Sequence, residues 1–324
     1  MEKNILIIFL LSVLCLIGLD NSKSIHKEKY SEYIIDSIVD LHQDTLIIPI
    51  DRLIRFMPNG IIRNGVVIFQ KGEYFVEATK KQRKCIVIGD TTEIIIDGNI
   101  RLLSNDLNSY NLLLLKGNNI IVKGMGTISG DKFEHLGKDG EWGHGIQVSG
   151  SGKVVVKNIT VKNCWGDCIY IRNKKANVTI DGCILDNGRR QGISITAADS
   201  VLIRNTLIKN VSGKSPQCAI DVEPNVNDTI VNIIIDNVKI KDCKGGIVAS
   251  SRSKNSYVGN VIVENCNVEG YIHYPYYFST LPKVSISNCK AGPGRLNITY
   301  KNVQRFVQKN NKIAGFKEPV TLKK

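Results

Sequence analysis

Several features that mark other classes of protein are missing from this chain of 324 residues. It has no C-x-x-C pair, so a zinc site or a thioredoxin-like redox site has no support. No Asp-rich calcium loop occurs, and we expect neither a metal nor a cofactor. No segment rich in proline, glycine or serine separates two regions, which favours one domain. With 43% hydrophobic and 23% charged residues, the composition excludes a disordered chain, a collagen-like chain and a multi-span membrane protein.

The charge balance is basic, with 43 Lys and Arg against 30 Asp and Glu, a formal net charge of +13. Such an excess favours an anionic partner, whether a nucleic acid, a membrane surface or an acidic polysaccharide. The basic residues are spread through the predicted turns, and no recognition helix or nucleic-acid motif is present. We therefore expect no nucleic-acid partner, and the oligomeric state is left open.

The first 24 residues have the pattern of an export signal. Lys3 precedes a nearly continuous apolar run over residues 5–19, and polar residues 20–24 follow at once. Fifteen apolar positions are short for a spanning helix of ~18–20 residues and typical of a signal-peptide core. We expect export to the periplasm, the cell surface or the medium, with a signal anchor or a buried helix as alternatives.

Short β-branched runs recur from about residue 94 onward, between turns of Asn, Asp and Gly and without a helical period. An I-x-(I/V) strand begins at Ile146, Ile169, Ile193 and Ile220, in steps of 23, 24 and 27 residues. Two further short strands recur within each unit. This period predicts an all-β parallel β-helix, since a leucine-rich repeat needs an absent L-x-x-L-x-L framework and a propeller needs ~40 residues per blade.

The two ends of such a stack need covers. Residues 28–42 carry Tyr30, Ile34, Ile38 and Leu41 at helical spacing, which predicts an amphipathic N-terminal helical cap. After Asn302 the repeat is lost, and we expect the last residues to close the other end. The predicted organisation is a signal peptide at 1–24, a capping segment at 25–60, the β-helix at 61–301 and a C-terminal cap or tail at 302–324.

Eight cysteines follow the predicted signal peptide, at positions 85, 164, 168, 183, 218, 243, 266 and 289. An even number in an exported chain is compatible with disulfides. Several of them, however, occupy equivalent positions in successive repeats, directly after an Asn, Asp or Gly. This favours a stack of small buried side chains over disulfide pairing.

Three segments resemble one superfamily, the right-handed β-helices of the pectate-lyase and polygalacturonase type. Residues 69–74 (FQKGEY) are similar to its F-P-x-G-x-Y entry segment. Residues 166–171 (GDCIYI) resemble the G-D-D-C-I-A-I coil of polygalacturonases, with Cys168 in place of the second aspartate. Residues 191–195 (QGISI) resemble their H-G-I-S-I coil, with Gln191 in place of the histidine. The resemblance covers roughly residues 60–290 and implies a right-handed single-stranded solenoid that acts on a polysaccharide.

Aligning the repeats on their first isoleucine converts sequence offsets into columns on one face of the stack. Neighbours in a column lie about 5 Å apart. The columns hold Trp142, Trp165 and Arg189 four residues before the isoleucine; His144, Asp167 and Gln191 two before; Tyr170 and Asp221 one after; and Arg172 and Glu223 three after. This mixture predicts a carbohydrate groove.

Aromatic and basic residues supply the predicted substrate contacts. Trp142 and Trp165 can stack on sugar rings, although tryptophans at turns also serve as core caps. Arg172, Arg189 and Arg190 can bind a uronate carboxylate, although the last two can equally form a solvated turn. The aromatic string at residues 271–278 breaks the repeat, and either flanks the groove or forms a packing patch.

Three carboxylates and one histidine are the candidate catalytic groups. Asp221 and Glu223 alternate outward on one strand with their Cα atoms about 6.6 Å apart, and Asp167 lies two coils away. A glycosidase needs one carboxyl protonated and a second ionised. His144 has the chemistry of an acid or base, or of a substrate contact.

We predict a glycoside hydrolase acting on a polysaccharide, which can contain uronic acids. A lyase or uronate epimerase is one alternative, in which Arg189, Arg190 and Gln191 neutralise the uronate while Tyr170 or His144 abstracts the C5 proton. A non-catalytic glycan-binding surface protein is the other alternative.

Overall fold

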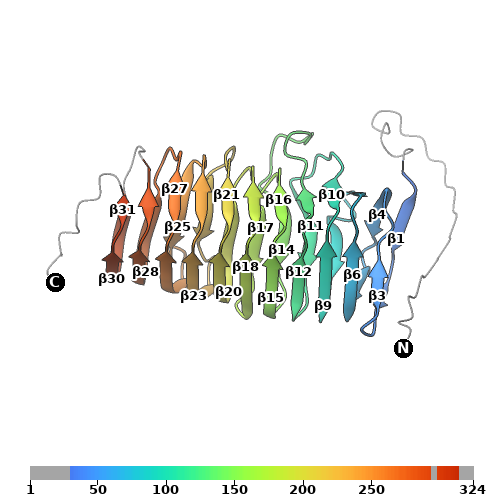
Figure 1. The fold of residues 1–324 in the computed structure, drawn as a ribbon, viewed down its shortest axis with the longest axis horizontal. Coiled ribbons are helices and arrows are strands. Elements are labelled where there is room, and N and C mark those ends of the chain that lie inside the picture. Colours follow the sequence, from blue (N-terminus) through green and yellow to red (C-terminus); the bar gives the residue numbers. More distant parts are fainter. Residues whose placement is uncertain (1–29, 293–297, 314–324) are drawn as a thin grey trace.

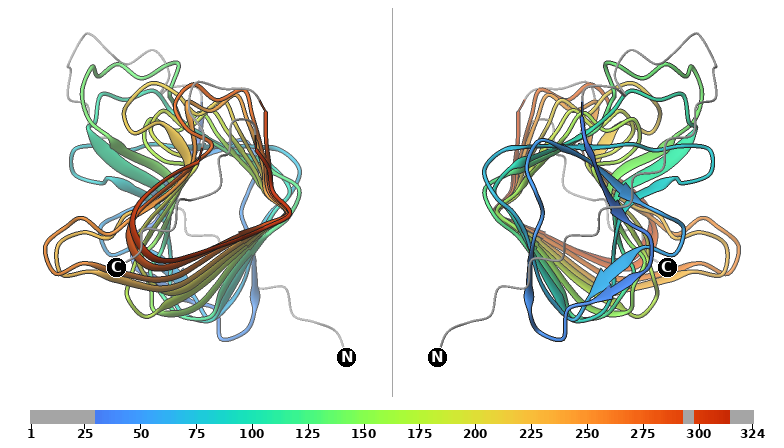
Figure 2. Two further views of the ribbon diagram at one scale, coloured as in Figure 1. Left: turned by 90° about the vertical axis from the view of Figure 1, so that its left-hand side faces the viewer. Right: turned by 90° about the vertical axis from the view of Figure 1, so that its right-hand side faces the viewer.

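The computed structural model describes residues 30–292 and 298–313. Over these residues the chain forms a right-handed parallel β-solenoid, whose strands stack in chain order from one end of the molecule to the other (Figures 1 and 2). All ladder pairings between the strands are parallel, one coil to the next. Among the described residues there is no helix, and hence none with the length and apolar character needed to cross a membrane.

Each coil contributes three short segments to two sheets. The 12-stranded sheet contains β1 (Glu32–Ile35), β4 (Arg52–Phe56), β7 (Glu73–Val76), β10 (Asn99–Leu102), β13 (Thr127–Ser129), β16 (Thr160–Lys162), β19 (Ile184–Asp186), β21 (Leu207–Lys209), β24 (Lys239–Lys241), β27 (Asn267–Glu269), β29 (Lys290–Ala291) and β31 (Lys312–Ile313). The first row of the 19-stranded sheet contains β2 (Ile38–Asp40), β5 (Ile61–Arg63), β8 (Lys84–Ile88), β11 (Ser109–Leu115), β14 (Trp142–Val148), β17 (Ile169–Arg172), β22 (Cys218–Val222) and β25 (Gly245–Ser250). Its second row contains β3 (Thr45–Ile47), β6 (Gly65–Phe69), β9 (Thr92–Ile96), β12 (Ile120–Lys123), β15 (Gly152–Lys157), β18 (Ala176–Asp181), β23 (Thr229–Asp236) and β26 (Tyr257–Glu264). Three long strands run through both rows: β20 (Ile193–Arg204), β28 (Tyr276–Ser287) and β30 (Thr299–Lys309).

The isoleucine repeat sets the register of the stack. Ile146 pairs with Ile169, Ile169 with Ile193, and Ile193 with Ile220. Each of these side chains is fully buried, so that identical branched groups lie on top of one another along the axis. One coil alone cannot bury them, which is why the coils stabilise each other by stacking. The prediction of a parallel β-helix from the repeat is confirmed.

Asparagines mark the corners between strands. We call Asn205, Asn237, Asn265, Asn288 and Asn310 the asparagine ladder; all five have φ between 50° and 55°. Asparagine tolerates this left-handed conformation better than most residues. The side-chain amide of Asn237 donates to Asn205 Oδ1 at 2.8 Å, and that of Asn288 donates to Asn265 Oδ1 at 3.3 Å. The ladder therefore ends each strand and joins neighbouring coils.

The eight predicted core cysteines are all unpaired and buried. Six of the thiols donate to backbone carbonyls, as Cys183 does to Val156 O at 3.5 Å. The stack of small buried side chains is confirmed, and the eight form no disulfide.

The predicted N-terminal helical cap is wrong over the residues that the structure describes. Residues 32–35 and 38–40 form β1 and β2. Ile34 and Ile38, which suggested the helical period, are 47% and 55% exposed, whereas Ile35 and Leu41 are buried. Pairs of adjacent apolar residues fit both a helical and a two-residue period, and pairing of β1 with β4 makes the extended form the stable one. The predicted signal peptide, residues 1–24, lies outside the described residues.

The solenoid also continues past residue 302, where we expected the repeat to end. β30 and β31 form a further coil, and Val303 and Phe306 pack against the core. Residues 314–324 lie outside the described part of the chain.

Candidate functional site

A polar wall runs along the first row of the 19-stranded sheet, on β14, β17, β20 and β22 and the turns before them. It is defined by His144, Asp167, Arg190, Gln191 and Asp221. The register places Tyr170 of β17 opposite Ser194 of β20, and Ser194 opposite Asp221 of β22, as the column predicted.

Two columns lie on the outer face of the sheet, one two residues before the repeated isoleucine and one directly after it. The glycines directly before the isoleucines explain how both can do so. A Cβ built on Gly145 would lie 2.5 Å from Val161 Cγ1, and one on Gly192 would lie 2.5 Å from Ile208 Cγ2. These positions therefore face the core, as the isoleucines after them do. The chain bends at Gly192, whereas Gly145 lies within β14. The preceding residues, Gln191 and His144, lie on the outer side of the sheet, where their side chains meet Asp221 and Asp167.

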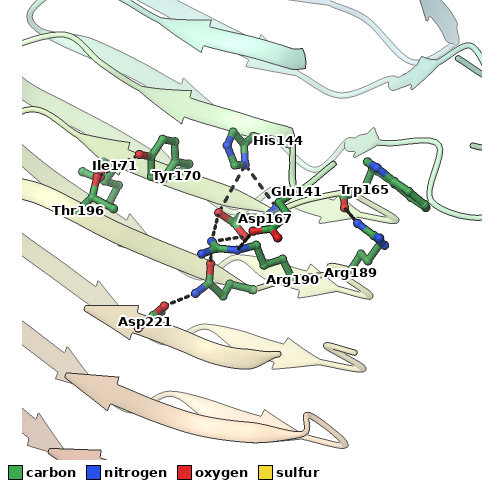
Figure 3. A network of polar contacts seen from close by, with 11 residues as sticks. Glu141, His144, Trp165, Asp167, Tyr170, Ile171, Arg189, Arg190, Thr196 and Asp221 are labelled. Atoms are coloured by element: carbon green, nitrogen blue, oxygen red, sulfur yellow. Dashed lines mark hydrogen bonds and ion pairs between the residues drawn. The ribbon is translucent and has the colours of Figure 1, made fainter. Parts of the chain in front are cut away.

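An unbroken series of contacts joins the wall across four coils (Figure 3). The backbone N–H of Asp167 donates to His144 Nδ1 at 3.4 Å, and His144 Nδ1 lies 3.5 Å from Asp167 Oδ2. Arg190 Nη1 donates to both carboxyl oxygens of Asp167, at 3.4 and 3.3 Å, and to Gln191 Oε1. Gln191 Nε2 in turn donates to Asp221 Oδ2. His144, Asp167 and Gln191 thus lie in line, as predicted.

Burial shifts the acid–base properties of this wall. His144, Asp167 and Asp221 are at most 3% exposed. Burial raises the pKa of Asp167 to about 7, against the opposing charge of Arg190. Burial, helped by the negative charge of Glu223, raises the pKa of Asp221 to about 7. Burial and the charges of nearby arginines lower the pKa of His144 to about 3, so the imidazole is neutral at pH 7.

Asp221 has one carboxyl oxygen free for other chemistry. Its Oδ2 accepts from Gln191, while its buried Oδ1 has no hydrogen-bond partner among the described residues. Glu223 comes two residues after Asp221, directly after the end of β22, and is exposed. The wall therefore holds a buried carboxyl of raised pKa two residues before an exposed glutamate.

Arg190 is occupied within the protein. Besides its bonds to Asp167 and Gln191, its Nε lies 3.5 Å from Glu141 Oε2. Glu141 Oε1 lies 3.5 Å from Lys214 Nζ. The binding of a uronate carboxylate that we predicted for Arg190 would have to compete with these contacts.

The sugar-stacking role predicted for Trp165 is wrong, because the indole is only 8% exposed. The ring of His135 stacks on it with 3.9 Å between centroids, and the Arg189 guanidinium carbon lies 3.7 Å from the ring centroid. Arg189 Nη1 also donates to Gly140 O at 2.7 Å, so this arginine packs beneath the loop at residues 130–141. Trp165 and Arg189 support the loop rather than forming an open surface.

A buried cluster that the sequence did not reveal fixes the same loop. Asp131 accepts from Tyr110 Oη, from Asn105 Nδ2 at 2.9 Å, and contacts His135 Nδ1 at 2.8 Å. The only sequence signal was the extra length between two repeats at residues 130–141. Neighbours from two different coils meet here without a regular offset, so the repeat alone could not place them.

The remaining predicted residues lie toward solvent. Trp142 is 54% exposed at the start of β14. Tyr170 is half-buried, stacked on His144 at 4.6 Å, and its Oη accepts from Thr196 Oγ1 at 3.2 Å. Arg172 is exposed, but a register shift pairs it with Ala197 rather than Thr196, so the predicted column of Arg172 and Glu223 is interrupted. The substrate contacts of Trp142, Tyr170 and Arg172 stay predictions.

Within residues 30–292 and 298–313, no group of three or more His, Cys, Asp or Glu side chains is arranged to hold a metal ion.

The chain belongs to the family described as the right handed beta helix region, whose model matches residues 64–258, more than half of its length. The Bacillus subtilis protein YclG is 27% identical over 251 residues, which cover 68% of this chain and 42% of YclG. The SPbeta prophage-derived protein YorA of the same organism is 25% identical over 289 residues, covering 74% of this chain and 49% of YorA. The chain thus spans less than half the length of both relatives.

Three solved structures are similar at low identity. The PfbA surface adhesin of Streptococcus pneumoniae has a TM-score of 0.45 at 10% identity, covering 86% of this chain and 91% of PfbA. The A-module of the Azotobacter vinelandii mannuronan C-5 epimerase AlgE6 has a TM-score of 0.38 at 11% identity, covering 77% and 90%. The catalytic domain of a GH87 alpha-1,3-glucanase in complex with nigerose has a TM-score of 0.43 at 11% identity, covering 87% and 63%. None of these scores reaches 0.5, so they carry no information on activity.

Proposed function

We propose that the protein is a glycoside hydrolase that cleaves an acidic polysaccharide on the polar wall, with Asp221 as general acid and Glu223 as the second carboxylate. The observation that carries this proposal is the environment of Asp221. Its pKa is raised to about 7, and one of its oxygens has no hydrogen-bond partner among the described residues. The exposed Glu223 follows two residues later in the chain.

The roles proposed for the two carboxyls are the two that glycoside hydrolysis requires, a proton donor and a second carboxylate. Asp221, protonated near neutral pH, gives its proton to the glycosidic oxygen as the bond from that oxygen to the anomeric carbon breaks. Glu223, which is exposed, either takes a proton from the attacking water or adds to the anomeric carbon before water releases the sugar. In the covalent route Asp221 then takes a proton from the water that releases the sugar, which restores both carboxyls. In the direct route Glu223 has gained a proton and Asp221 has lost one, and proton exchange with solvent restores both.

We assign Asp167 a positioning role instead of the catalytic role predicted from the sequence. Its side chain is 0% exposed and is held between His144 and Arg190. Through Arg190 it orients Gln191, which holds Asp221 Oδ2. Burial and the charges of nearby arginines lower the pKa of His144 to about 3, which makes its imidazole a weak base for the lyase or epimerase alternative.

The charge distribution supports an anionic substrate. Residues 30–150 contain 13 Lys and Arg against 15 Asp and Glu, whereas residues 151–313 contain 23 against 11. The positive excess thus begins at the wall and extends over the C-terminal coils. A positive field of this kind raises the rate at which a polyanion is captured. The predicted signal peptide supports the further proposal that the protein acts outside the cytoplasm.

The test is incubation with a panel of acidic and neutral polysaccharides, read for new reducing ends and for ultraviolet-absorbing unsaturated products. We expect reducing ends from an acidic polymer, without unsaturation. Asp221→Asn should abolish them, whereas Asp199→Asn, which neutralises an exposed aspartate of β20, should not. Unsaturated products would show a lyase, altered sugars without new ends an epimerase, and saturable binding without chemistry a glycan-binding protein. Each of these three results would contradict the proposal.

A further inference from the structure

Two tyrosines lie on the same outward column as Asp221, one on each side. The register runs from Tyr170 through Ser194 to Asp221, and from Asp221 through Val248 to Tyr277. Each tyrosine is therefore two coils from Asp221, about 10 Å along the axis. The carboxyl that we propose as acid is thus at the midpoint of a row about 20 Å long.

Each tyrosine is paired with an exposed arginine. The Arg172 guanidinium carbon lies 6.0 Å from the Tyr170 ring centroid, and that of Arg252 lies 5.1 Å from the Tyr277 ring centroid. Arg252 Nη2 also donates to Tyr277 Oη. Both tyrosines are half-buried and both arginines are exposed, so one edge of each pair faces solvent.

The second pair is continuous with the polar wall. In the column of Gln191 the next two coils carry small residues, Cys218 and Gly245. Tyr274 then follows, with its Cε2 atom 3.2 Å from a Cβ built on Gly245 and its ring 5.3 Å from that of Tyr277. Burial raises the pKa of Tyr274, and the charges of Cys218 and Asp221 act in the same direction. The small side chain at Gly245 thus leaves room for the ring of Tyr274.

We infer that Tyr277 and Arg252 form a second subsite for an acidic sugar residue, C-terminal to Asp221, matching the Tyr170 and Arg172 pair on the other side. An aromatic ring contacts the apolar face of a sugar, and a guanidinium binds a carboxylate in the same residue. Only a chain of several sugar residues can reach both pairs at once. Because Asp221 lies between them, the enzyme cleaves inside a polymer chain rather than at its end. The cleavage mode rests on the proposed function, whereas the subsite itself does not.

Binding in the absence of turnover tests the subsite. We would use the Asp221→Asn protein and measure dissociation constants by calorimetry for oligogalacturonates and oligomannuronates of increasing length. Affinity for at least one series should rise with length and then level off once the oligomer reaches both pairs. Tyr277→Ala or Arg252→Ala should remove the gain of the longer oligomers, a loss of about tenfold, while the shortest binding oligomer is unaffected.

Exposed residues outside the row provide matched controls. Tyr257→Ala and Lys254→Ala remove an aromatic ring and a cation from exposed positions in and before β26, and should leave the length dependence unchanged. If Tyr277→Ala fails to fold, Arg252→Ala on its exposed side chain gives the answer alone. The inference is overturned if no oligomer binds, if affinity does not depend on length, or if the row variants behave as the controls do.

The inference and the proposed function can fail separately. If binding depends on length and Tyr277→Ala removes this dependence, but the unmodified protein cleaves nothing, the subsite is supported and the hydrolase proposal is contradicted. Cleavage that depends on Asp221 but releases only terminal sugars, with Tyr277→Ala unchanged, would do the reverse. Cleavage within chains should lower the viscosity of the polymer faster than it releases reducing ends.

Discussion

The asparagine ladder and the polar wall are two stacks of polar side chains in one solenoid, and they are built in opposite ways. The ladder repeats one residue at the surface, and Asn237 and Asn205, for example, bond amide to amide at 2.8 Å. The wall combines unlike residues beneath the surface, where the guanidinium of Arg190 lies between Asp167 and Gln191. Both stacks use the same spacing between coils, yet only the wall contains ionisable groups.

The contrast separates a structural stack from a functional one. An exposed amide is satisfied by its neighbour or by water, and it costs little at any coil. Buried carboxyls and a buried guanidinium lose their hydration, and a well-packed apolar set is often no less stable. Apolar residues at the positions of the wall would allow the same solenoid to fold. The burial of ionisable groups across these four coils, with Asp221 at the end, is the reason for proposing chemistry there.

Removal of the central cation should have the largest effect. Arg190→Met leaves Asp167 with no positive partner, and at pH 8 it should lower the free energy of unfolding by roughly 3–5 kcal/mol. The loss should shrink at pH 5, where the carboxyls are protonated. Denaturant unfolding at the two pH values measures both quantities. Lys175→Met, at an exposed turn, is the control, and a loss as small as that of the control would show that the wall is no different from the surface.

The pH dependence of Asp167 should be the next largest effect. Its pKa is raised in the folded state to about 7 from 3.8, so the native state holds a proton that the unfolded state releases. Its contribution to stability is therefore fully present below pH 4 and is lost as the pH rises to 7, by up to about 4 kcal/mol. The stability of Asp167→Asn relative to the unmodified protein should rise over that range.

An exposed acid sharpens this test because its sign is opposite. Hydrogen bonds from Asn205 and Arg204 outweigh desolvation and lower the pKa of Asp181. Asp181 therefore stabilises the fold above pH 4 and loses that effect as the pH falls. Asp181→Asn should lose stability relative to the unmodified protein as the pH rises. Unfolding curves for both variants between pH 4 and 8 that move in the same direction would contradict the distinction between wall and surface.

The smallest effect is expected in the ladder. Asn237→Ala removes one exposed amide bond and puts an alanine into a left-handed conformation, at a cost of about 1–3 kcal/mol. Asn237→Gly removes the same bond without the conformational cost and should lose less. Thermal unfolding of the two variants separates the contribution of the amide hydrogen bond from the conformational cost of alanine. Catalytic activity should be unchanged in both variants. Reduced activity would mean that the ladder contributes to the site as well.

The sequence predicted the fold and the columns for a definite physical reason. Inward isoleucines must stack, so Ile146, Ile169 and Ile193 set a register that carries His144, Asp167 and Gln191 with them. We predicted that Arg190 binds substrate because the sequence position of a long side chain does not determine the direction in which it points. We predicted that Trp165 stacks on a sugar because the repeat gives no sign of the loop whose His135 covers the indole.

The errors at the ends have another cause. Ile34 and Ile35 are adjacent apolar residues, and adjacent apolar pairs occur in helices and in strands alike. The partner strand β4, not the local pattern, decides which of the two faces the core. At the other end, β30 has only partly buried apolar residues, so the repeat is hard to recognise in sequence although its register is intact.

The central claim is that Asp221 keeps its proton at near-neutral pH because it is buried beside Glu223. A carboxyl-carbon NMR titration of aspartate-labelled protein tests it directly, with Asp221→Asn to identify the resonance. We predict a pKa near 7 for Asp221, which falls when Glu223→Gln removes the neighbouring charge. A pKa below 5 for Asp221, or one that Glu223→Gln leaves unchanged, would contradict it.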